Sequence, residues 1–458
     1  VGMTPSALAY DSQKKWLHVV CSDVNAVGVV EGLSARARVL GFVPVGAYPV
    51  AARVLSGDRL MTMNADGDRP KLQGTASIVA GLDAERLISL TGEVRRNSPY
   101  RDERLFNAGV PAGNPVPNVP GQVSSIKYVV YVLKGRLGYD EVFGDLPQGK
   151  GDPSRARFGE SITPNHHKLA REFVLFDNFY ANAESPAEGL FWASAAIAPD
   201  FIRRVEPSRQ AGRGGDSAFE LGEPAATPPG GYLWTSASLA GVTLRNYGWR
   251  SENRPKPLAD GTQIARVTDP VLEKVTNRRY RAADPHASDV DRVKIFLEDL
   301  AEFEKAGSMP RLLLLRLGND GASVPAAENR PAAEMVADND LALGMLAEAV
   351  SKSRFWKETA ILVIEAGAGD GRDRANGQRT PALVISPYAR RGAVDSNFYN
   401  TTSALRTVEL ILGLRPMTLF DAGSFPMWTA FQAEPDPRPY ALATPGGDGT
   451  NSHAKGLP

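Results

Sequence analysis

The chain has 458 residues, 43% of them apolar and 23% charged, and its 52 basic side chains match 52 acidic ones in number. This length suffices for two domains, one of them large. A neutral chain produces no net field that would draw a polyanion, so the composition argues against a general role on nucleic acid or on a membrane surface. The single cysteine, Cys21, excludes an internal disulfide framework and a CxxC metal or redox site.

A weak internal repeat marks the N-terminal region. The runs Pro5-Ser-Ala-Leu-Ala-Tyr and Lys15-Trp-Leu-His recur 44 positions later as Pro49-Val-Ala-Ala-Arg-Val and Arg59-Leu-Met-Thr. This spacing is the length of one four-stranded propeller blade. Short β-rich runs split by polar turns are also typical of a meander. The repeat therefore predicts two or three β-propeller blades.

So few blades cannot close a propeller ring, and open blades leave unpaired strand edges. We therefore predict that residues 1–94 form a partial β-propeller and that another polypeptide completes it. This partner would be a missing N-terminal segment or a separate subunit, and the lack of an initiator Met favours cleavage. We expect it to contact Val19, Val29, Val30 and residues 53–55. The alternative is an ordinary small β-sheet packed on the large domain.

Residues 95–122 are rich in Pro, Gly and Asn, which predicts a linker. From 123 to 435 continuous apolar runs alternate with amphipathic helices, a pattern typical of an α/β domain whose mainly parallel sheet is covered on both faces. We predict that residues 436–458 form a poorly ordered tail. The predicted strands are residues 127–133, 173–179, 312–317, 360–365 and 381–386, and the predicted helices are 163–173, 288–300, 333–355 and 401–412.

Reactive groups in open α/β sheets lie in the loops that leave the carboxyl ends of the strands. Four such loops follow predicted strands here. The first loop is residues 134–140, the second 180–192, the third 318–323 and the fourth 366–378.

Four long runs carry a family resemblance: residues 139–149, 163–180, 335–344 and 381–392. They resemble the bacterial phosphoesterase family of phospholipase C and acid phosphatase, which belongs to the alkaline-phosphatase superfamily. The N-terminal repeats are similar to the YVTN-type propeller that precedes this domain in some members. The resemblance implies an alkaline-phosphatase-like fold and a periplasmic or extracellular location.

The first two loops depart from the family pattern. Members usually read Glu-Asn-Arg-Thr-Tyr-Asp in the first loop, where the Glu and Asn help to hold metal, and Ser-Ala-Asp-Gly-His in the second, where the resemblance implies that the Ser is the nucleophile. Proline, which replaces that Ser here, has no hydroxyl to phosphorylate. The matched positions are Gly135, Arg136, Leu137 and Gly138 in the first loop, and Pro186, Ala187, Glu188, Gly189 and Leu190 in the second.

The other two loops also lack their histidines. The usual Asn-Asp-His-Thr of the third loop is replaced by Asn319, Asp320, Gly321 and Ala322. In the fourth, the usual Glu-Asp-Asp, Asp-His and a further His before Arg have become Glu365-Ala366-Gly367, Asp373-Arg374 and Gln378 before Arg379.

A two-metal phosphoryl-transfer site needs several carboxylates and imidazoles, and an activated nucleophile. Arg136 and Arg374 would instead bring positive charge, which repels divalent cations. We therefore expect no metal, cofactor or catalytic residue, and interpret the chain as an inactive phosphoesterase-like protein with a structural, assembly or binding role. None of the five histidines lies in the four loops: they are His18, His166, His167, His286 and His453.

Two other functions stay open. An active phosphoric-ester hydrolase with a relocated or reduced site would use paired carboxylates with split pKa values as acid and base. A ligand-binding module would reuse the empty cleft. His166 and His167 lie on a predicted helix, where packing or capping is the simpler role. The carboxylates available to a relocated site are Asp140, Glu188, Asp320 and Glu365.

Overall fold

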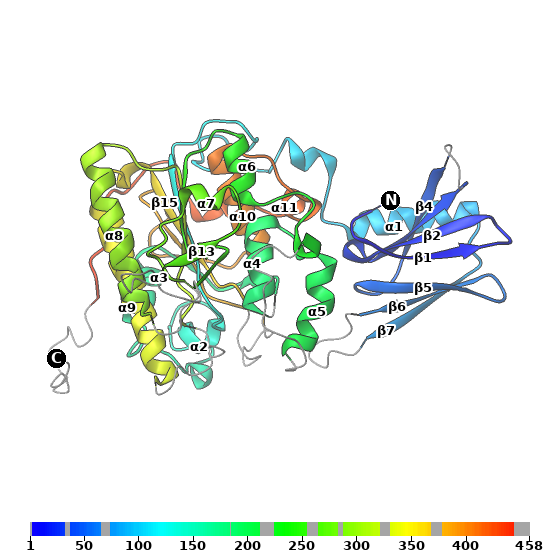
Figure 1. Ribbon diagram of the computed structural model, residues 1–458, viewed down its shortest axis with the longest axis horizontal. Coiled ribbons are helices and arrows are strands. Elements are labelled where there is room, and N and C mark those ends of the chain that lie inside the picture. Colours follow the sequence, from blue (N-terminus) through cyan, green and yellow to red (C-terminus); the bar gives the residue numbers. More distant parts are fainter. Residues whose placement is uncertain are drawn as a thin grey trace. The chain divides into compact units, whose positions relative to one another are not determined.

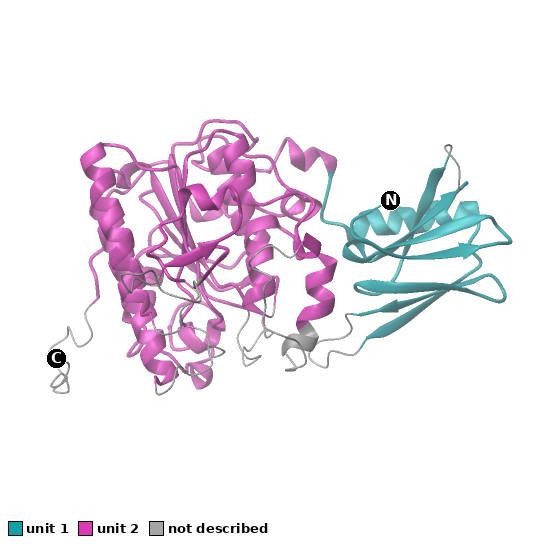
Figure 2. Ribbon diagram, in the orientation of Figure 1, with its two compact units in different colours: residues 1–101 teal, residues 102–458 magenta. Residues whose placement is uncertain are grey.

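The computed structural model divides the chain into two compact units, Val1–Arg101 and Asp102–Pro458 (Figure 2). The predicted domain boundary at residue 94 falls within helix α1 (Ala84–Asn97). Within the described ranges, no helix combines the length and apolarity that a membrane span requires. The described residues are 2–32, 37–65, 74–183, 185–210, 224–253, 264–282, 287–320, 330–367 and 378–443.

Unit 1 contains two antiparallel sheets and α1 (Figure 1). Val20, Val29 and Leu60 belong to the core of this unit, together with Leu82, just before α1, and Leu87 in its first turn. The four-stranded sheet has the order β1 (Pro5–Asp11), β2 (Trp16–Cys21), β3 (Ala26–Glu31), β4 (Arg38–Pro44), and the three-stranded sheet has the order β5 (Pro49–Leu55), β6 (Arg59–Asn64), β7 (Thr75–Ala80).

The backbone of unit 1 repeats with the spacing seen in the sequence. β1 and β5 are both seven residues long and begin 44 positions apart. Each has a register shift against its neighbour at the same place, between Pro5 and Ala7 in β1 and between Pro49 and Ala51 in β5. A bulge of this kind bends a strand and increases its twist, so the two sheets begin with the same local distortion.

Helix α1 was not among the predicted elements. Asp83 caps it by accepting a hydrogen bond from the backbone N–H of Arg86, and Leu87 is its one buried residue. The Thr91 hydroxyl accepts a hydrogen bond of 2.8 Å from the backbone N–H of Phe42 in β4. Leu87, Leu90 and Val94 recur at helical spacing, so the sequence held a signal for this helix, which the prediction of propeller blades over residues 1–94 passed over.

The main sheet of unit 2 has the order β11 (Leu244–Tyr247), β14 (Leu312–Arg316), β8 (Tyr128–Leu133), β15 (Thr359–Ile364), β16 (Ala382–Ile385). The first four strands are parallel, and β16 is antiparallel to β15. All residues of β8 and β15 are buried. The predicted mainly parallel α/β sheet flanked by helices is confirmed, and the N-terminal region contains antiparallel sheets together with the helix α1.

Helices cover both faces of this sheet. Figure 1 shows α8 (Asp289–Ala306) and α9 (Ala332–Lys352) on one side, with α4 (Pro186–Ala195) and α10 (Thr401–Leu412) on the other. Ser288 caps α8 and Asn400 caps α10, each through a side-chain oxygen that accepts a backbone N–H. The predicted helix 401–412 therefore has the bounds of α10.

The predicted strand 173–179 is wrong as a single strand of the main sheet. It forms β9 (Val174–Phe176) and β10 (Phe179–Tyr180), which pair in parallel with β17 (Ala393–Asp395) and β18 (Tyr399–Asn400) in two small sheets. The polar pair Asp177-Asn178 separates β9 from β10. The Asn178 side-chain amide donates a hydrogen bond of 3.1 Å to the carbonyl of Ser396.

Two other features differ from the sequence prediction. β11 was missed because its sequence, Leu-Arg-Asn-Tyr, is half polar, yet Asn246 is fully buried and donates to the Thr276 hydroxyl at 2.8 Å. The segment predicted as a poorly ordered tail begins with an ordered stretch. Tyr440 is buried there, and its hydroxyl donates to the side-chain oxygen of Asn165 at 2.7 Å.

Candidate functional site

The carboxyl ends of three adjacent strands bring together Lys134, Asp320 and Glu365. Lys134 directly follows β8, Glu365 directly follows β15, and Asp320 lies just beyond β14. The backbone continues the strand pairing here, since the N–H of Lys134 donates to the carbonyl of Ile364 at 2.8 Å. These three side chains are at most 2% exposed.

The Lys134 ammonium lies between the two carboxylates. Its Nζ is 2.7 Å from Asp320 Oδ2 and 2.9 Å from Glu365 Oε1. The second oxygen of Asp320, Oδ1, accepts the backbone N–H of Gly135 at 2.7 Å. We call Lys134, Asp320 and Glu365 the buried triad. Through one cation it connects the first loop, which begins with Lys134, the third loop, which contains Asp320, and Glu365, which directly precedes the fourth loop.

The buried triad holds more negative than positive charge. Burial alone would lower the pKa of Lys134, but the adjacent Asp320 and Glu365 carboxylates outweigh it and raise that pKa. Burial raises the pKa of Glu365 to about 8, the Asp320 charge adds to this rise, and Lys134 opposes it. A proton on Glu365 near neutral pH therefore balances the cluster.

The second loop begins helix α4. Pro186 is its first residue, where a missing N–H costs nothing. The hydroxyl of the preceding residue, Ser185, caps the helix by accepting the backbone N–H of Glu188 at 3.1 Å. The Glu188 carboxylate accepts a hydrogen bond of 3.2 Å from the indole N–H of Trp192. These contacts assign Ser185 and Glu188 to the helix itself.

The second and fourth loops are in direct backbone contact. A Cβ placed on Gly189 would lie 1.4 Å from the carbonyl oxygen of Ala366, so only glycine fits there. The N–H of Gly367 donates to the carbonyl of Gly135 at 3.2 Å, which ties the fourth loop to the first. Leu190 is buried in α4. Ordinary packing therefore connects the described positions of these loops.

Other predicted positions are placed individually. The Gln378 carbonyl accepts the N–H of Ala181 at 2.9 Å, so this end of the fourth loop lies beside the start of the second loop. Arg136 is half-buried in the first loop. Gly321 and Arg374 lie outside the described residues.

Asp140, one of the four carboxylates considered for a relocated site, is held by Arg379. The Arg379 guanidinium donates to Asp140 Oδ1 at 2.8 Å, and also to the carbonyls of Lys150 and Asp177 at 3.1 Å. It stacks 4.3 Å from the ring centre of Tyr139. Of the four carboxylates, the structure thus joins Asp320 and Glu365 around one lysine, while Asp140 and Glu188 have separate contacts.

His166 and His167 both lie in α3 (Pro164–Glu172). His166 Nδ1 is 2.6 Å from Asp340 Oδ1, and His167 Nε2 is 2.8 Å from Asp145 Oδ1. Burial lowers the pKa of His166, and the positive charge of Lys134 lowers it further. Since these bonds fix α3 to neighbouring segments, they favour the packing role for both histidines.

The described residues do not fit the metal that the family resemblance implies. Among them, no group of three or more His, Cys, Asp and Glu side chains is arranged to hold a metal ion. Where Asp320 and Glu365 converge, the Lys134 ammonium already makes the short contacts that a cation would make. Sequence reasoning missed Lys134, although a lysine that ends a continuous apolar strand signals a buried, paired cation.

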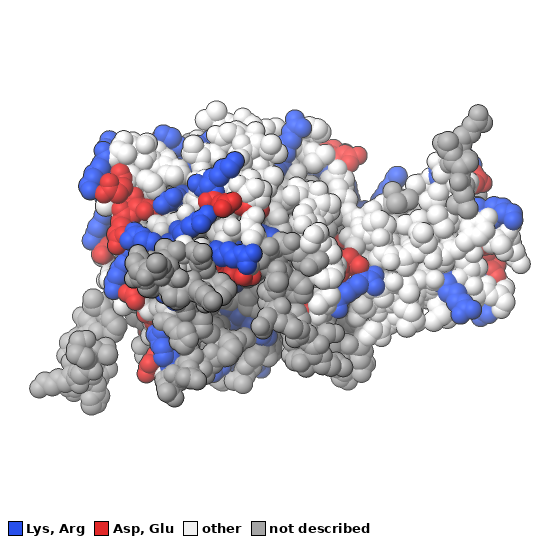
Figure 3. Space-filling model, viewed as in Figure 1, with Lys and Arg blue, Asp and Glu red and all other residues white. Residues whose placement is uncertain are grey.

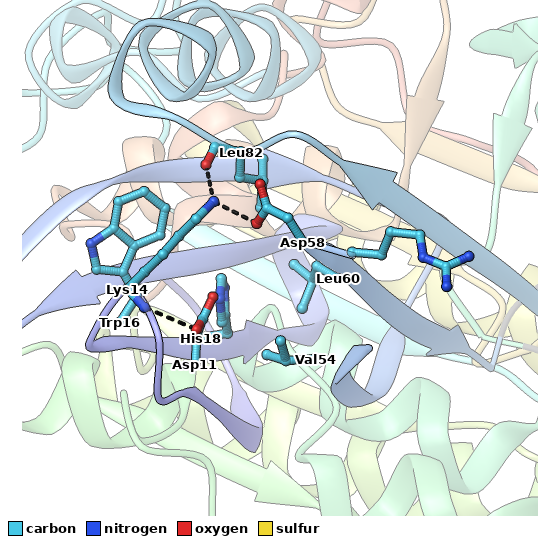
Figure 4. Close-up of a pocket in the computed structure, with 9 residues that line it drawn as sticks. Asp11, Lys14, Trp16, His18, Val54, Asp58, Leu60 and Leu82 are labelled. Carbon is cyan, nitrogen blue, oxygen red and sulfur yellow. Dashed lines mark hydrogen bonds and ion pairs between the residues drawn. The ribbon is translucent and has the colours of Figure 1, made fainter. Parts of the chain in front are cut away.

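A small pocket in unit 1 lies between the β1–β2 and β5–β6 hairpins (Figure 4). Lys14 crosses it, bonds to Asp58 and to the carbonyl of Leu82, and lies 5.0 Å from the ring centre of Trp16. The enclosed volume is about 10 Å³, which is room for about one water molecule. His18 is buried beside it, and burial lowers its pKa. This ion pair fills the pocket.

The face of unit 2 shown in Figure 3 carries interspersed basic and acidic side chains. On α8, for example, Lys294 pairs with Asp291 at 2.9 Å and Lys305 pairs with Glu302 at 2.6 Å. Interspersed charges of both signs do not build the single-sign field that attracts a polyanion.

Comparison with solved structures finds several of similar fold, all at low identity. One is a protein of the alkaline phosphatase superfamily from Vibrio parahaemolyticus, with 18% identity, a TM-score of 0.43, and coverage of 71% of this chain and 79% of that one. Another is the lipoteichoic acid synthase LtaP from Listeria monocytogenes, with 12% identity, a TM-score of 0.44, and coverage of 69% and 80%.

Among curated proteins, none matches this chain. The model of the phosphoesterase family matches residues 146–415, which is more than half of the chain. The matched segment contains the second, third and fourth loops and two members of the buried triad, Asp320 and Glu365. The chain belongs to the phosphoesterase family.

Proposed function

We propose that the phosphoesterase domain of this chain is catalytically inactive and has a structural, assembly or binding role. One observation carries the proposal: the ammonium of Lys134 lies between Asp320 and Glu365, and all three side chains are buried. Metal-assisted phosphoryl transfer needs carboxylates that are free to hold the ion. Here the two carboxyl groups that converge are already in contact with a side-chain cation.

The second loop supports the same proposal. Pro186 has no hydroxyl, and the neighbouring hydroxyl of Ser185 accepts the helix-capping bond from Glu188. Ser185 is 4% exposed, which leaves little access for a phosphoric ester. An activated nucleophile needs both an approach path and a base within hydrogen-bond reach.

The alternative is an active phosphoric-ester hydrolase with a reduced site. The raised pKa of Glu365 beside Asp320 favours this alternative, because two carboxylates with split pKa values can act as acid and base. Burial of both groups, together with their bonds to Lys134, opposes it.

An activity assay decides between these two functions. The purified chain is incubated with p-nitrophenyl phosphate and with bis-p-nitrophenyl phosphate in the presence of Mg²⁺, Mn²⁺, Zn²⁺ or Ca²⁺. We expect no turnover above the protein-free rate. Turnover that rises with protein concentration and disappears in Asp320→Asn would establish the hydrolase instead.

We also propose that another polypeptide, a missing N-terminal segment or a separate subunit, adds a further β-sheet to unit 1. Leu8, Tyr10 and Val39 are apolar side chains that are 44–64% exposed. Leu8 is paired with Val19 in register, and directly paired residues share one face of a sheet. The exposed side chains therefore flank Val19 and Val30 on the face opposite the core.

The repeated bulge of β1 and β5 supports a repeating architecture whose next member would cover this face. The expected contact set needs one correction, because Val29 belongs to the core of unit 1 and is fully buried. A periplasmic or extracellular location is part of the same proposal. Intact mass spectrometry with size-exclusion light scattering tests whether a second polypeptide is present. A well-folded monomer of 49.2 kDa without a second polypeptide would contradict the proposed partner.

A further inference from the structure

Resting on the inactivity proposed above, we propose that Lys134 is an internal replacement for a divalent cation, and that Asp320 and Glu365 form a latent cation site beneath it. The lysine side chain enters from the end of β8, between the ends of β14 and β15. Its ammonium lies 2.7 and 2.9 Å from one oxygen of each carboxylate. Hard cations are held by carboxylate oxygens in this manner, at about 2.0–2.6 Å.

The charge balance distinguishes the buried triad from an ordinary buried salt bridge. A salt bridge needs one carboxylate for one ammonium, and every further buried carboxylate adds a desolvation cost. Here a single ammonium serves two carboxyl groups that follow different strands, and it balances their charge only while Glu365 holds a proton. A divalent ion would neutralise both carboxylates without that proton.

The hydrogen bonding of the triad is incomplete. Asp320 Oδ1 is held by the N–H of Gly135, whereas Asp320 Oδ2, which the ammonium contacts as an ion pair, and Glu365 Oε2 are both buried without a hydrogen bond among the described residues. A buried polar atom without a partner is uncommon and calls for a physical reason. A pair of carboxylates arranged around a metal ion, with a lysine later placed between them, accounts for these two oxygens.

Removing the ammonium should therefore uncover the site. Methionine has nearly the length and volume of lysine, so Lys134→Met keeps the packing of β8 and removes the charge. Two buried carboxylates that face each other then attract a small divalent ion, and Mn²⁺ or Mg²⁺ can be held by one or two carboxylates with water as the remaining ligands. Mn²⁺ is the better probe because its binding is read directly by electron paramagnetic resonance.

The experiment compares wild type, Lys134→Met and the matched control Lys134→Met/Glu365→Gln, all refolded with and without Mn²⁺. We expect Lys134→Met to bind one Mn²⁺ per chain at least about tenfold more tightly than wild type does, and to melt at a higher temperature when Mn²⁺ is present. The control should lose both effects because one carboxylate is gone.

Each remaining outcome overturns the inference. Equal Mn²⁺ binding by wild type and Lys134→Met would show that the ammonium does not occupy a cation site. A Lys134→Met chain that folds without binding Mn²⁺, or that fails to fold even in saturating Mn²⁺, would show that no latent site exists. Phosphatase activity of the wild type is a separate result, since it would contradict the proposed inactivity without changing the Mn²⁺ comparison.

Discussion

Two buried ion clusters of unit 2 differ in how their charges balance. Asp140 and Arg379 form a one-to-one pair, in which the guanidinium also bonds to two backbone carbonyls and stacks on Tyr139. The buried triad has one ammonium for two carboxyl groups and leaves two of their oxygens, Asp320 Oδ2 and Glu365 Oε2, without a hydrogen bond among the described residues. A pair that balances without an added proton is what a fold needs for packing, whereas the triad balances only with a proton on Glu365 and so retains the charge pattern of a site.

The largest expected effect is at the balanced pair. Arg379→Met should lower the free energy of unfolding by about 3–5 kcal/mol, because it leaves the Asp140 carboxylate buried without its cation. Urea denaturation monitored by circular dichroism measures the change. The control is Lys150→Met, whose exposed ammonium lies 3.7 Å from Asp177, and its cost should stay below about 1 kcal/mol. Equal costs would remove the distinction between the two positions.

Removing the cation of the triad should cost less. Lys134→Met in metal-free buffer should lower the free energy of unfolding by about 2–3 kcal/mol at pH 8, because Glu365 can take up a proton in place of the lost charge. The loss should be smaller at pH 5, where protonation is easier. Lys127→Met, an exposed lysine just before the same strand, is the control. A larger loss at pH 5 than at pH 8 would contradict this charge balance.

A steric test examines the contact between the second and fourth loops. Gly189→Ala should destabilise unit 2 by about 1–3 kcal/mol, since the added methyl collides with the carbonyl of Ala366. The matched control is Gly92→Ala in α1, where a Cβ meets only the flexible end of Arg96 at 3.3 Å and where alanine is the better helix former by about 0.5–1 kcal/mol. Thermal melting of both variants gives the comparison. A harmless Gly189→Ala would show that these loops are not closely packed.

The last expected effect concerns the pH dependence of stability. The pKa of Glu365 in the folded chain is raised to about 8 from the ordinary value of 4.5. The folded state therefore binds this proton more tightly than the unfolded state does, so the contribution of Glu365 is fully present below pH 4.5 and is lost as pH rises towards 8. Glu365→Gln should remove this slope, so the variant should gain stability relative to wild type as pH rises from 5 to 8.

Denaturation of both proteins from pH 5 to pH 8 measures that slope. Glu298→Gln, which changes an exposed carboxylate on α8, should retain the wild-type slope. If wild type and Glu365→Gln lost stability in parallel over this range, the titration would belong to another group.

Much of the fold could be predicted from the sequence, because buried parallel strands have a strong signature. The runs that form β8 and β15 are continuous and apolar, and both are buried strands. The polar sequence of β11 hid that strand, whereas α1 has apolar residues at helical spacing and was missed because residues 1–94 were assigned to propeller blades. The order of the strands depends on pairing between distant segments, which local patterns do not contain.

The candidate site was predicted only in part. Asp320 and Glu365 were considered as carboxylates, but Lys134 was not, since it precedes the positions that match the family motif. Its contact with Glu365 joins residues 231 positions apart, a proximity that the sequence does not reveal. A general rule would have found the lysine itself, because a lysine is rarely buried without a paired carboxylate.

The lysine between the two carboxylates also determines where the positive charge comes from. The Lys134 ammonium is covalently part of every chain. A bound metal ion, by contrast, has to be acquired from the surroundings and can be removed by a chelator. The ends of β8, β14 and β15 are thus joined by a cation that cannot dissociate. This part of the molecule can form in a metal-poor compartment, and it cannot take up the wrong metal.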